Sequence, residues 1–382
     1  VQATKEAQAE VTAAVDRNMS MSADLDAKWK EFQAKFDALM QNSVAAIAGA
    51  LGAVAPNTTL RPAELVDEFR VAQVLRRSSK VVVLTGAGVS AESGIPTFRG
   101  ADGFWTVGSK NYQPQELATW EKFNEMPEEL WRWYQYRWGI CRNAKPNAGH
   151  KALVELEGLL PGGIDLVTQN IDGLHRLAGS SEARLYEVHG WIDQMRCDER
   201  LQGSCLHGVS LDDAELFERA RSTIAVVPKP AARESDEPLP RCANCGVRQR
   251  PNILWFDECY NEAFYRSRSA LAAAETCDVL LIIGTQLTTG LPRRIVSAAR
   301  ASGAIVVRMD PLVDLKEDSS AGMLHLQGKS GEVLPRIVAE LRALLAEPIM
   351  APLADAQAST LAAGPSPTPK AAAKARANSK TA

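Results

Sequence analysis

The chain has 382 residues, of which 46% are hydrophobic and 23% are charged, and its formal net charge is −3. These values are typical of a globular protein and exclude a wholly disordered, collagenous or coiled-coil chain. No apolar run is long enough to span a bilayer, so we expect no membrane partner, and the acidic balance argues against a basic nucleic-acid-binding domain.

The first predicted element is an amphipathic helix near the N-terminus. Trp29, Phe32, Phe36 and Leu39 recur at helical spacing. We expect residues 1–61 to form a helical N-terminal extension that packs on its own domain, although its apolar face could instead bind a partner. Acidic residues in this region argue against a transit peptide, so we expect a cytoplasmic location, with the mitochondrion and the nucleus as alternatives.

Five short runs rich in Val, Ile and Leu follow, and each ends in small or polar residues. They lie at residues 80–86, 165–170, 185–190, 279–285 and 304–310. Continuous apolar strands that alternate with helical stretches predict an α/β fold with a parallel sheet covered on both faces. Because ligands of such sheets bind beyond the carboxyl ends of the strands, these polar strand ends predict one large site.

The first strand end carries Thr-Gly-Ala-Gly-Val-Ser at residues 85–90. A Gly-x-Gly turn lets backbone N–H groups approach a pyrophosphate, although such turns also serve tight packing. Ala91 stands where the usual fingerprint has a third glycine. The rigid Gly-Ile-Pro at residues 94–96 then leads into Phe98 and Arg99, a pattern that suits a loop closing over a dinucleotide.

Hydrogen-bonding side chains follow the next two strands. Gln169, Asn170 and Asp172 leave the second strand together and could bind ribose hydroxyls and a carboxamide, or one of them could cap a helix. His189 ends the third strand, where an imidazole can act as a general base near neutral pH. A lone histidine is more often structural, but its place among the other strand ends favours a functional role.

The 7 cysteines are an odd number in a long chain, which favours a reducing compartment with thiols free to bind metal. Cys242 and Cys245 form a CxxC knuckle, and Cys197 and Cys205 precede it. Together they predict a structural zinc site with four thiolate ligands, in which His207 could replace Cys205.

The last segment, residues 347–382, is rich in Ala, Pro and Lys, and we expect a disordered basic tail. Such a tail could contact nucleic acid or an acidic partner. A solvated tail without a partner is at least as consistent with this composition.

Taken in order, these motifs resemble those of the sirtuin family. The matching segments are residues 86–90, 98–99, 168–172, 189–190, the four cysteines, 250–251, 255–256 and 284–285. The resemblance covers about residues 62–346 and implies a sirtuin catalytic domain with a zinc-ribbon insertion at about residues 191–253. The implied fold is a Rossmann-like doubly wound parallel sheet with a smaller module of helices and a zinc ribbon.

The resemblance also implies an activity, the NAD-dependent removal of acyl groups from protein lysines, with nicotinamide and O-acyl-ADP-ribose as products. NAD and a structural zinc are the implied cofactors, acyl-lysine proteins are the implied substrates, and His189 matches the general base. Gln286 and Asp310 depart from the residues that are usual in the family. The positions assigned to the cofactor site are Gly86, Ala87, Ser90, Phe98, Arg99, Gln169, Asn170, Asp172, Gly284, Thr285, Gln286, Asp310 and Ser330.

A finer resemblance concerns the acyl group. Tyr134 and Arg137 are three residues apart, so on a helix they share a face, where a phenol and a guanidinium could bind a carboxylate. The pattern is similar to the Tyr-x-x-Arg of the desuccinylase and demalonylase branch, and Ala91 would leave room for a longer acyl chain. This implies a preference for succinyl and malonyl groups. The alternative is a surface helix on which Arg137 is merely solvated.

Trp255 and Phe256 match the loop that pairs with the substrate in the family. Asp257 replaces the usual Gly, and its charge near the cleft counts slightly against an acidic acyl group. Three other functions remain open: a general lysine deacetylase, a mono-ADP-ribosyltransferase on the same fold, and a non-catalytic NAD-binding or chromatin-interaction protein. An intact His189 favours deacylation, because a binding protein would not need a general base.

Overall fold

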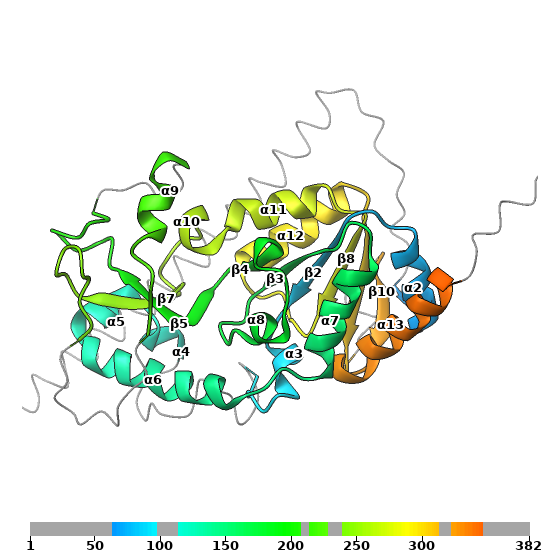
Figure 1. Ribbon diagram of the computed structural model, residues 1–382, viewed down its shortest axis with the longest axis horizontal. Helices are drawn as coiled ribbons and strands as arrows, with labels where there is room; N and C mark the ends of the chain where they lie inside the picture. The colour runs from blue at the N-terminus through cyan, green and yellow to red at the C-terminus, as the bar shows by residue number, and fades with distance from the viewer. Residues whose placement is uncertain (1–62, 98–113, 208–213, 228–238, 313–321, 347–382) are drawn as a thin grey trace, which may run out of the picture. The chain divides into compact units, whose positions relative to one another are not determined.

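The computed structural model describes residues 63–97, 114–207, 214–227, 239–312 and 322–346 (Figure 1). The predicted N-terminal extension, 1–61, and the predicted basic tail, 347–382, lie outside these residues. Within the described part of the chain, no helix is long and apolar enough to cross a bilayer.

A parallel sheet of seven strands forms the centre of the fold. In spatial order its strands are β1 (Glu64–Leu65), β10 (Leu324–Gln327), β9 (Ile305–Asp310), β8 (Val279–Ile283), β2 (Val81–Thr85), β3 (Ile164–Thr168) and β4 (Leu185–Glu187). All neighbouring pairs are parallel. The five predicted strands and their parallel arrangement are therefore confirmed, whereas β1 and β10 were not predicted.

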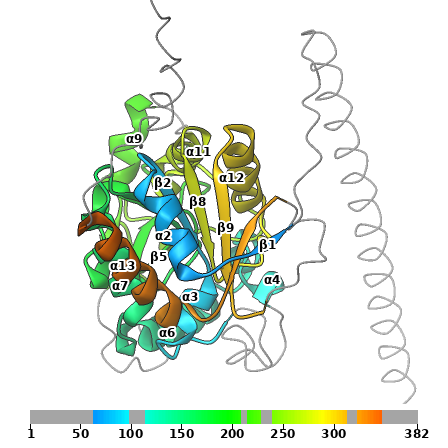
Figure 2. The same cartoon turned by 90° about the vertical axis from the view of Figure 1, so that its right-hand side faces the viewer.

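Two helical layers cover the sheet, because successive side chains of a buried strand point to opposite faces. Val81 and Val83 pack in one core with α2 (Glu68–Arg76), α7 (Ala148–Leu159) and α13 (Ser330–Ala346). Val82 and Leu84 pack in another core with α11 (Ser267–Glu275) and α12 (Gly290–Ala301). The helices of both layers are labelled in Figure 2. Every side chain of β2 is buried, which explains its continuous apolar sequence.

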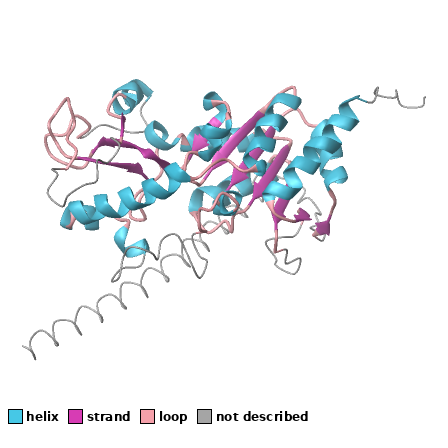
Figure 3. Ribbon diagram, turned by 60° about the horizontal axis from the view of Figure 1, so that its bottom comes forward, coloured by secondary structure: helices cyan, strands magenta, loops and turns pink. Residues whose placement is uncertain are grey.

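A smaller module joins helices to a second sheet, which is antiparallel with the order β6-β5-β7. Its strands are β5 (Gly190–Cys197), β6 (Ala225–Val226) and β7 (Gln249–Ile253), and its helices are α5 (Trp120–Glu125), α6 (Pro127–Asn143) and α9 (Ala214–Arg221). Figure 3 shows both sheets among their helices. The small sheet lies within the segment predicted to be a zinc ribbon.

Short helices complete the fold: α3 (Ala87–Ala91), α4 (Pro114–Leu117), α8 (Leu174–Ala178), α10 (Glu262–Tyr265) and the 3₁₀ turn η1 (Glu182–Arg184).

The strand order reverses between β2 and β8, which lie side by side in the sheet. From β2 the chain continues to β3 and β4 on one side, and it later returns to β8, β9 and β10 on the other side. The carboxyl ends of β2 and β8 therefore flank a topological switch point, where ligands of open α/β sheets bind.

Candidate active site

The glycine loops that follow β2 and β8 touch one another at this switch point. The N–H of Gly88, in the helix that Ala87 begins, donates to the carbonyl oxygen of Gly284 at 2.9 Å. A Cβ atom at Gly86 would lie 2.6 Å from Cβ of Thr285, and one at Gly88 would lie 2.7 Å from Cα of Gly284. Close packing of the two loops therefore requires both glycines. This is the tight-packing role that the sequence left open for the Gly-x-Gly turn.

Polar side chains from the segments that follow β2 and β3 form a hydrogen-bonded cluster beside these loops. Ser90 Oγ donates to Asp172 Oδ2 at 2.7 Å, and Asn170 Nδ2 donates to Gly86 O at 3.0 Å and to Ser90 Oγ at 3.1 Å. Asp172 also accepts from the N–H of Leu174 at 2.9 Å, so its carboxylate stabilises the start of α8 as well. Burial raises the pKa of Asp172, and the hydrogen bonds from Leu174 and Ser90 act in the opposite direction.

Gln169 connects the end of β3 to the loop after β8. Its Nε2 donates to Thr285 Oγ1 at 2.7 Å and to the carbonyl oxygen of Thr85 at 3.3 Å. Its Oε1 accepts from Thr289 Oγ1 at 3.3 Å. The side chain of Gln286 is exposed. Gln169 therefore fixes the three central strand ends in one arrangement.

Two further predicted cofactor residues, Asp310 and Ser330, make hydrogen bonds within the protein. The carboxylate of Asp310, at the end of β9, accepts from the N–H of Leu312 at 3.0 Å. Ser330 is buried at the start of α13 and donates to Glu92 Oε2 at 3.3 Å. Glu92 also accepts from the N–H of Gly331 at 2.8 Å and so caps that helix.

Two residues predicted to bind the substrate, Ala91 and Phe256, are exposed. Ala91 is exposed at the end of α3. Phe256 is 51% exposed, and its N–H donates to the carbonyl oxygen of Ala118 at 3.0 Å. Phe98 and Arg99, both predicted to close over a cofactor, lie outside the described residues.

His189 follows β4 and makes one contact with each ring nitrogen. Nδ1 lies 3.0 Å from the carbonyl oxygen of Gln169, and Nε2 lies 3.0 Å from the hydroxyl of Tyr260. A carbonyl oxygen can only accept, so the hydrogen bond to Gln169 places the proton of the neutral ring on Nδ1. Burial lowers the pKa of His189 to about 4, and the Gln169 carbonyl opposes this shift. The ring is therefore neutral at pH 7 and has its lone pair on Nε2.

Two further histidines lie behind the strand ends. Nε2 of His175, in α8, lies 3.0 Å from Oγ1 of Thr85, and its ring centroid lies 4.8 Å from that of His150. Both rings are buried, and neither nitrogen of His150 has a hydrogen-bond partner among the described residues. Burial lowers the pKa of His150 to about 4 and that of His175 well below its usual value.

This buried pair predicts that the fold loses stability in acid. Below pH ~6.5 the unfolded chain binds protons at these histidines and the folded chain does not, so the free energy of unfolding falls by about 1.4 kcal/mol per pH unit for each histidine. We expect His150→Phe to reduce the loss between pH 7 and pH 5 by about 1–2 kcal/mol. Urea unfolding at the two pH values measures this. An equal loss in both proteins would contradict a neutral buried His150.

The predicted acyl-binding residues lie on the buried face of α6. Tyr134 is 2% exposed and Arg137 is 0% exposed, so the alternative of a solvated Arg137 is wrong. The guanidinium of Arg137 lies 3.5 Å from the ring centroid of Trp133 and donates to the Trp133 carbonyl oxygen at 3.1 Å. The hydroxyl of Tyr134 accepts from Nε1 of Trp255, itself buried, at 2.9 Å. Trp255 therefore holds Tyr134 rather than lining the surface.

Asp257 stabilises a helix terminus instead of standing alone at the cleft. Its carboxylate oxygens accept from the backbone N–H groups of Trp120, at 2.8 and 3.0 Å, and of Glu121, at 3.3 Å. The positive end of α5 thus partly neutralises the charge that we expected to repel an acidic acyl group. The adjacent Glu258 forms a two-pronged ion pair with the buried Arg250, which fixes this loop on β7.

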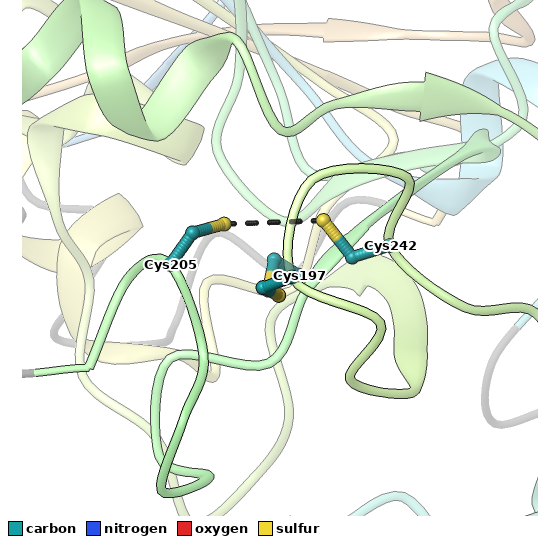
Figure 4. Close-up of side chains that lie close together, drawn as sticks. Cys197, Cys205 and Cys242 are labelled. Atoms are coloured by element: carbon teal, nitrogen blue, oxygen red, sulfur yellow. Dashed lines mark hydrogen bonds between the residues drawn. The ribbon is translucent and has the colours of Figure 1, made fainter.

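Four thiols meet at one end of the small sheet. Cys197 ends β5, and the sulfurs of Cys197, Cys205, Cys242 and Cys245 all lie within 4.8 Å of one another. Cys197 Sγ lies 3.5 Å from Cys245 Sγ. Cys205 Sγ lies 3.9 Å from Cys242 Sγ, and Figure 4 shows this pair together with Cys197. A tetrahedral zinc with Zn–S bonds of about 2.3 Å requires S–S separations of about 3.8 Å. His207 is exposed and does not belong to this group.

Sequence reasoning missed two residues of this site, Tyr260 and His175. Tyr260 lies in the loop before α10, at the end of the run Asp-Glu-Cys-Tyr at residues 257–260. The only feature of this run that could have pointed to it is an aromatic side chain in a polar loop. His175 was visible in the motif after β3 but received no role. Their contacts join residues 71 and 90 positions apart, so no local pattern could reveal them.

Comparisons with known proteins agree with this geometry. The model of the Sir2 family matches residues 86–290. The NAD-dependent protein deacylase of Leptospira interrogans is 38% identical over 263 residues, which is 69% of this chain and 93% of that protein. NAD-dependent protein deacylase 2 of Pyrobaculum aerophilum is 37% identical over 276 residues, which is 72% of this chain and 96% of that protein.

Solved structures give the same result. A Sir2 homologue in complex with NAD is 32% identical, with a TM-score of 0.59 over 75% of this chain and 97% of that chain. A Sir2 protein bound to a deacetylated peptide and 3′-O-acetyl-ADP-ribose is 26% identical, with a TM-score of 0.56 over 72% of this chain and 98% of that chain. The family match, the relatives and the fold agree, and this chain belongs to the Sir2 family of NAD-dependent protein deacylases, the sirtuins.

Proposed function

We propose that this deacylase prefers lysine acyl groups that end in a carboxylate, such as succinyl and malonyl. The observation that carries the proposal is the fully buried guanidinium of Arg137, three residues from Tyr134 on the buried face of α6. A buried guanidinium can bind a carboxylate through charge-assisted hydrogen bonds, and a phenol three residues away on the same face can add another. An acyl chain that ends in a carboxylate matches this pair.

The surroundings of Arg137 are suited to a planar anion. Burial lowers its pKa to about 10, which still leaves the guanidinium charged at pH 7. Its stacking on Trp133 holds the plane of the guanidinium, and a held plane favours two parallel hydrogen bonds to a carboxylate. Because the Tyr134 oxygen accepts from Trp255, the phenol keeps its own proton as a donor, and burial raises its pKa above the usual value.

The roles of the other site residues follow from their hydrogen bonds. Bound NAD supplies an electrophilic ribose carbon and a leaving group, nicotinamide. Gln169, Asn170 and Ser90 would orient it, since their amide and hydroxyl groups converge at the ends of β2 and β3. His189 would take a ribose hydroxyl proton at Nε2, the nitrogen that carries its lone pair when Nδ1 donates to Gln169.

We also propose that Cys197, Cys205, Cys242 and Cys245 bind one structural zinc. Burial and the neighbouring Cys197 raise the pKa of the Cys205 thiol. Because the four thiols lie so close together, deprotonating all of them is unfavourable without a metal. A bound divalent cation would make the four thiolates favourable. Four protein ligands fill a tetrahedral site, which leaves no position for a reacting group.

The acyl preference is tested by Arg137→Met, which keeps the apolar stem and removes the charge. We expect desuccinylation of a lysine peptide to fall by about tenfold or more, the effect of losing a charge-assisted hydrogen bond, with deacetylation of the same peptide nearly unchanged. The measurement is kcat/KM for both peptides at saturating NAD. Arg132→Met, on the exposed face of the same helix, is the matched control and should change neither value.

Two results would contradict the acyl preference. The unmutated protein could remove acetyl faster than succinyl from the same peptide, which would make it a general lysine deacetylase. Alternatively, Arg137→Met could lower both activities equally, which would assign Arg137 a structural role. Mass spectrometry of the peptide products distinguishes these outcomes, and it also detects ADP-ribose transferred to protein.

A further inference from the structure

We infer that Asn147 is a positioning residue for the cofactor site, because its amide group holds the end of α3, the helix that carries Ser90. The inference rests on the cofactor role proposed above for Ser90 and does not depend on the preferred acyl group. Asn147 lies half-buried immediately before α7. Its contact in α3, Val89, lies 58 residues earlier in the chain.

The amide of Asn147 uses its oxygen and its nitrogen for two different contacts. Oδ1 accepts from the N–H groups of Gly149, at 2.9 Å, and His150, at 3.3 Å, and so caps α7. Nδ2 donates to the carbonyl oxygen of Val89 at 2.8 Å and to the hydroxyl of Ser93 at 3.0 Å. Serine or aspartate could supply the capping oxygen, but only an amide can cap and also donate both of the other hydrogen bonds.

The Val89 carbonyl group connects Asn147 to the cofactor site. It belongs to the last turn of α3, where a helix leaves carbonyl groups without an internal partner. It is also part of the peptide group that joins Val89 to Ser90, so the amide of Asn147 fixes the plane from which Ser90 projects. Ser90 Oγ donates to Asp172 at 2.7 Å and accepts from Asn170 at 3.1 Å. A rotation of this peptide group would move the hydroxyl away from both partners.

The helix α3 depends on such contacts, because five residues are too few for a helix to be stable by itself. Its start is held where the N–H of Gly88 donates to the carbonyl oxygen of Gly284 at 2.9 Å. Beyond its end, the Glu92 carboxylate accepts from the N–H of Gly331, at the start of α13, at 2.8 Å. Of these anchors, only Asn147 contacts the peptide group of Ser90 itself.

The start of α7 is a firm base for this amide. Leu153 and Leu156 of α7 are fully buried in the core that α7 shares with α13. A Cβ atom at Gly149 would lie 3.1 Å from the carbonyl carbon of Ser330, so the glycine lets the starts of the two helices meet closely. With α3 held on this base, NAD meets a hydrogen-bonded cluster that is already ordered. Without the amide contacts, ordering the cluster would reduce the affinity for NAD.

The test is Asn147→Ser, which keeps an oxygen that can cap α7 and removes the amide nitrogen. We expect the Kd for NAD, measured by calorimetry on the full chain, to rise by about threefold to tenfold, the size of one or two lost hydrogen bonds. The KM for NAD should rise with it, while kcat and the KM for an acetyl-lysine peptide stay within about twofold. The midpoint of urea unfolding should stay close to that of the unmutated protein.

Two further variants separate the cap from the amide contacts. Asn147→Ala removes both, so it should weaken NAD binding as Asn147→Ser does and also lower the urea midpoint. Asp67→Ser is the matched control, because the Asp67 carboxylate caps α2 by accepting from the N–H of Arg70 at 2.8 Å. There one capping residue replaces another in a helix without an assigned site residue, so neither the Kd nor the midpoint should change.

Ser90→Ala tests the role on which the inference rests. It should weaken NAD binding by itself, and adding Asn147→Ser should weaken it little further, because Asn147 acts through Ser90. An unchanged Kd in Ser90→Ala would overturn the cofactor role of Ser90 together with the inference. If Ser90→Ala does weaken binding, three results would overturn the inference alone: an unchanged Kd in Asn147→Ser, losses that add fully in the double variant, or a urea midpoint as low in Asn147→Ser as in Asn147→Ala.

Discussion

Replacing His189 with alanine is expected to lower deacylation turnover by a factor of about a hundred or more, the usual contribution of a general base, while NAD binding persists. The reason lies in the hydrogen bonds of the ring. Gln169 holds Nδ1, burial keeps the imidazole neutral, and Nε2 retains the lone pair that a ribose hydroxyl needs. The measurements are the rate at which free lysine peptide forms and the affinity for NAD by calorimetry.

The matched control is His207→Ala, because His207 is exposed and outside the thiol cluster. It should leave both turnover and NAD affinity unchanged. Near-normal turnover in His189→Ala would contradict the proposed role of the base. A parallel loss of turnover and NAD affinity would instead show that His189 acts by holding Gln169 and the cofactor loop.

The core of the fold could be read from the sequence because of how its strands are buried. A strand covered on both faces has no polar positions, so β2 and β8 appear as uninterrupted apolar runs. The strands at one edge give no such signal. β1 has two residues, both exposed, and β10 has four residues, of which two are buried. Their pairing depends on the finished sheet, not on their own sequence.

The sequence could predict those site residues that stand at the carboxyl ends of strands. A parallel sheet brings Gln169, His189 and Gly284 to one edge, and the structure has them there. The pattern could also place Tyr134 and Arg137 on one face of α6, but it could not say that this face is the buried one. That fact depends on Trp255, which lies 121 residues from Tyr134 along the chain.

Asp257 shows how tertiary contacts change the effect that a charged side chain is expected to have. In the sequence it is an acidic residue in a substrate loop, and it counted against an acidic acyl group. In the structure its two oxygens accept from N–H groups of Trp120 and Glu121, at the start of a helix 136 or 137 residues away. A carboxylate at a helix N-terminus is stabilised by the helix dipole, so its repulsion of a nearby anion is reduced.

Replacing Cys242 with serine is expected to remove the zinc and lower the free energy of unfolding by about 3 kcal/mol or more, since metal binding is part of folding in such sites. Through the proposed zinc, the four thiols would crosslink three separate parts of the chain: the end of β5, the turn that carries Cys205, and the CxxC knuckle before β7. Without the metal, nothing covalent would hold the knuckle to β5. Atomic absorption should find about one zinc per unmutated chain, and urea unfolding measures the loss of stability.

The control for this prediction is Cys259→Ser, because Cys259 is exposed and outside the cluster. It should keep the zinc and the stability of the unmutated protein, which separates loss of a ligand from loss of any thiol. Cys205→Ser tests the weakest member of the set, because seven residues separate Cys205 from Cys197 where a knuckle has two. We expect it to lose zinc as Cys242→Ser does. Stoichiometric zinc in Cys205→Ser would remove Cys205 from the ligand set and assign its place to His207, two residues along the same turn.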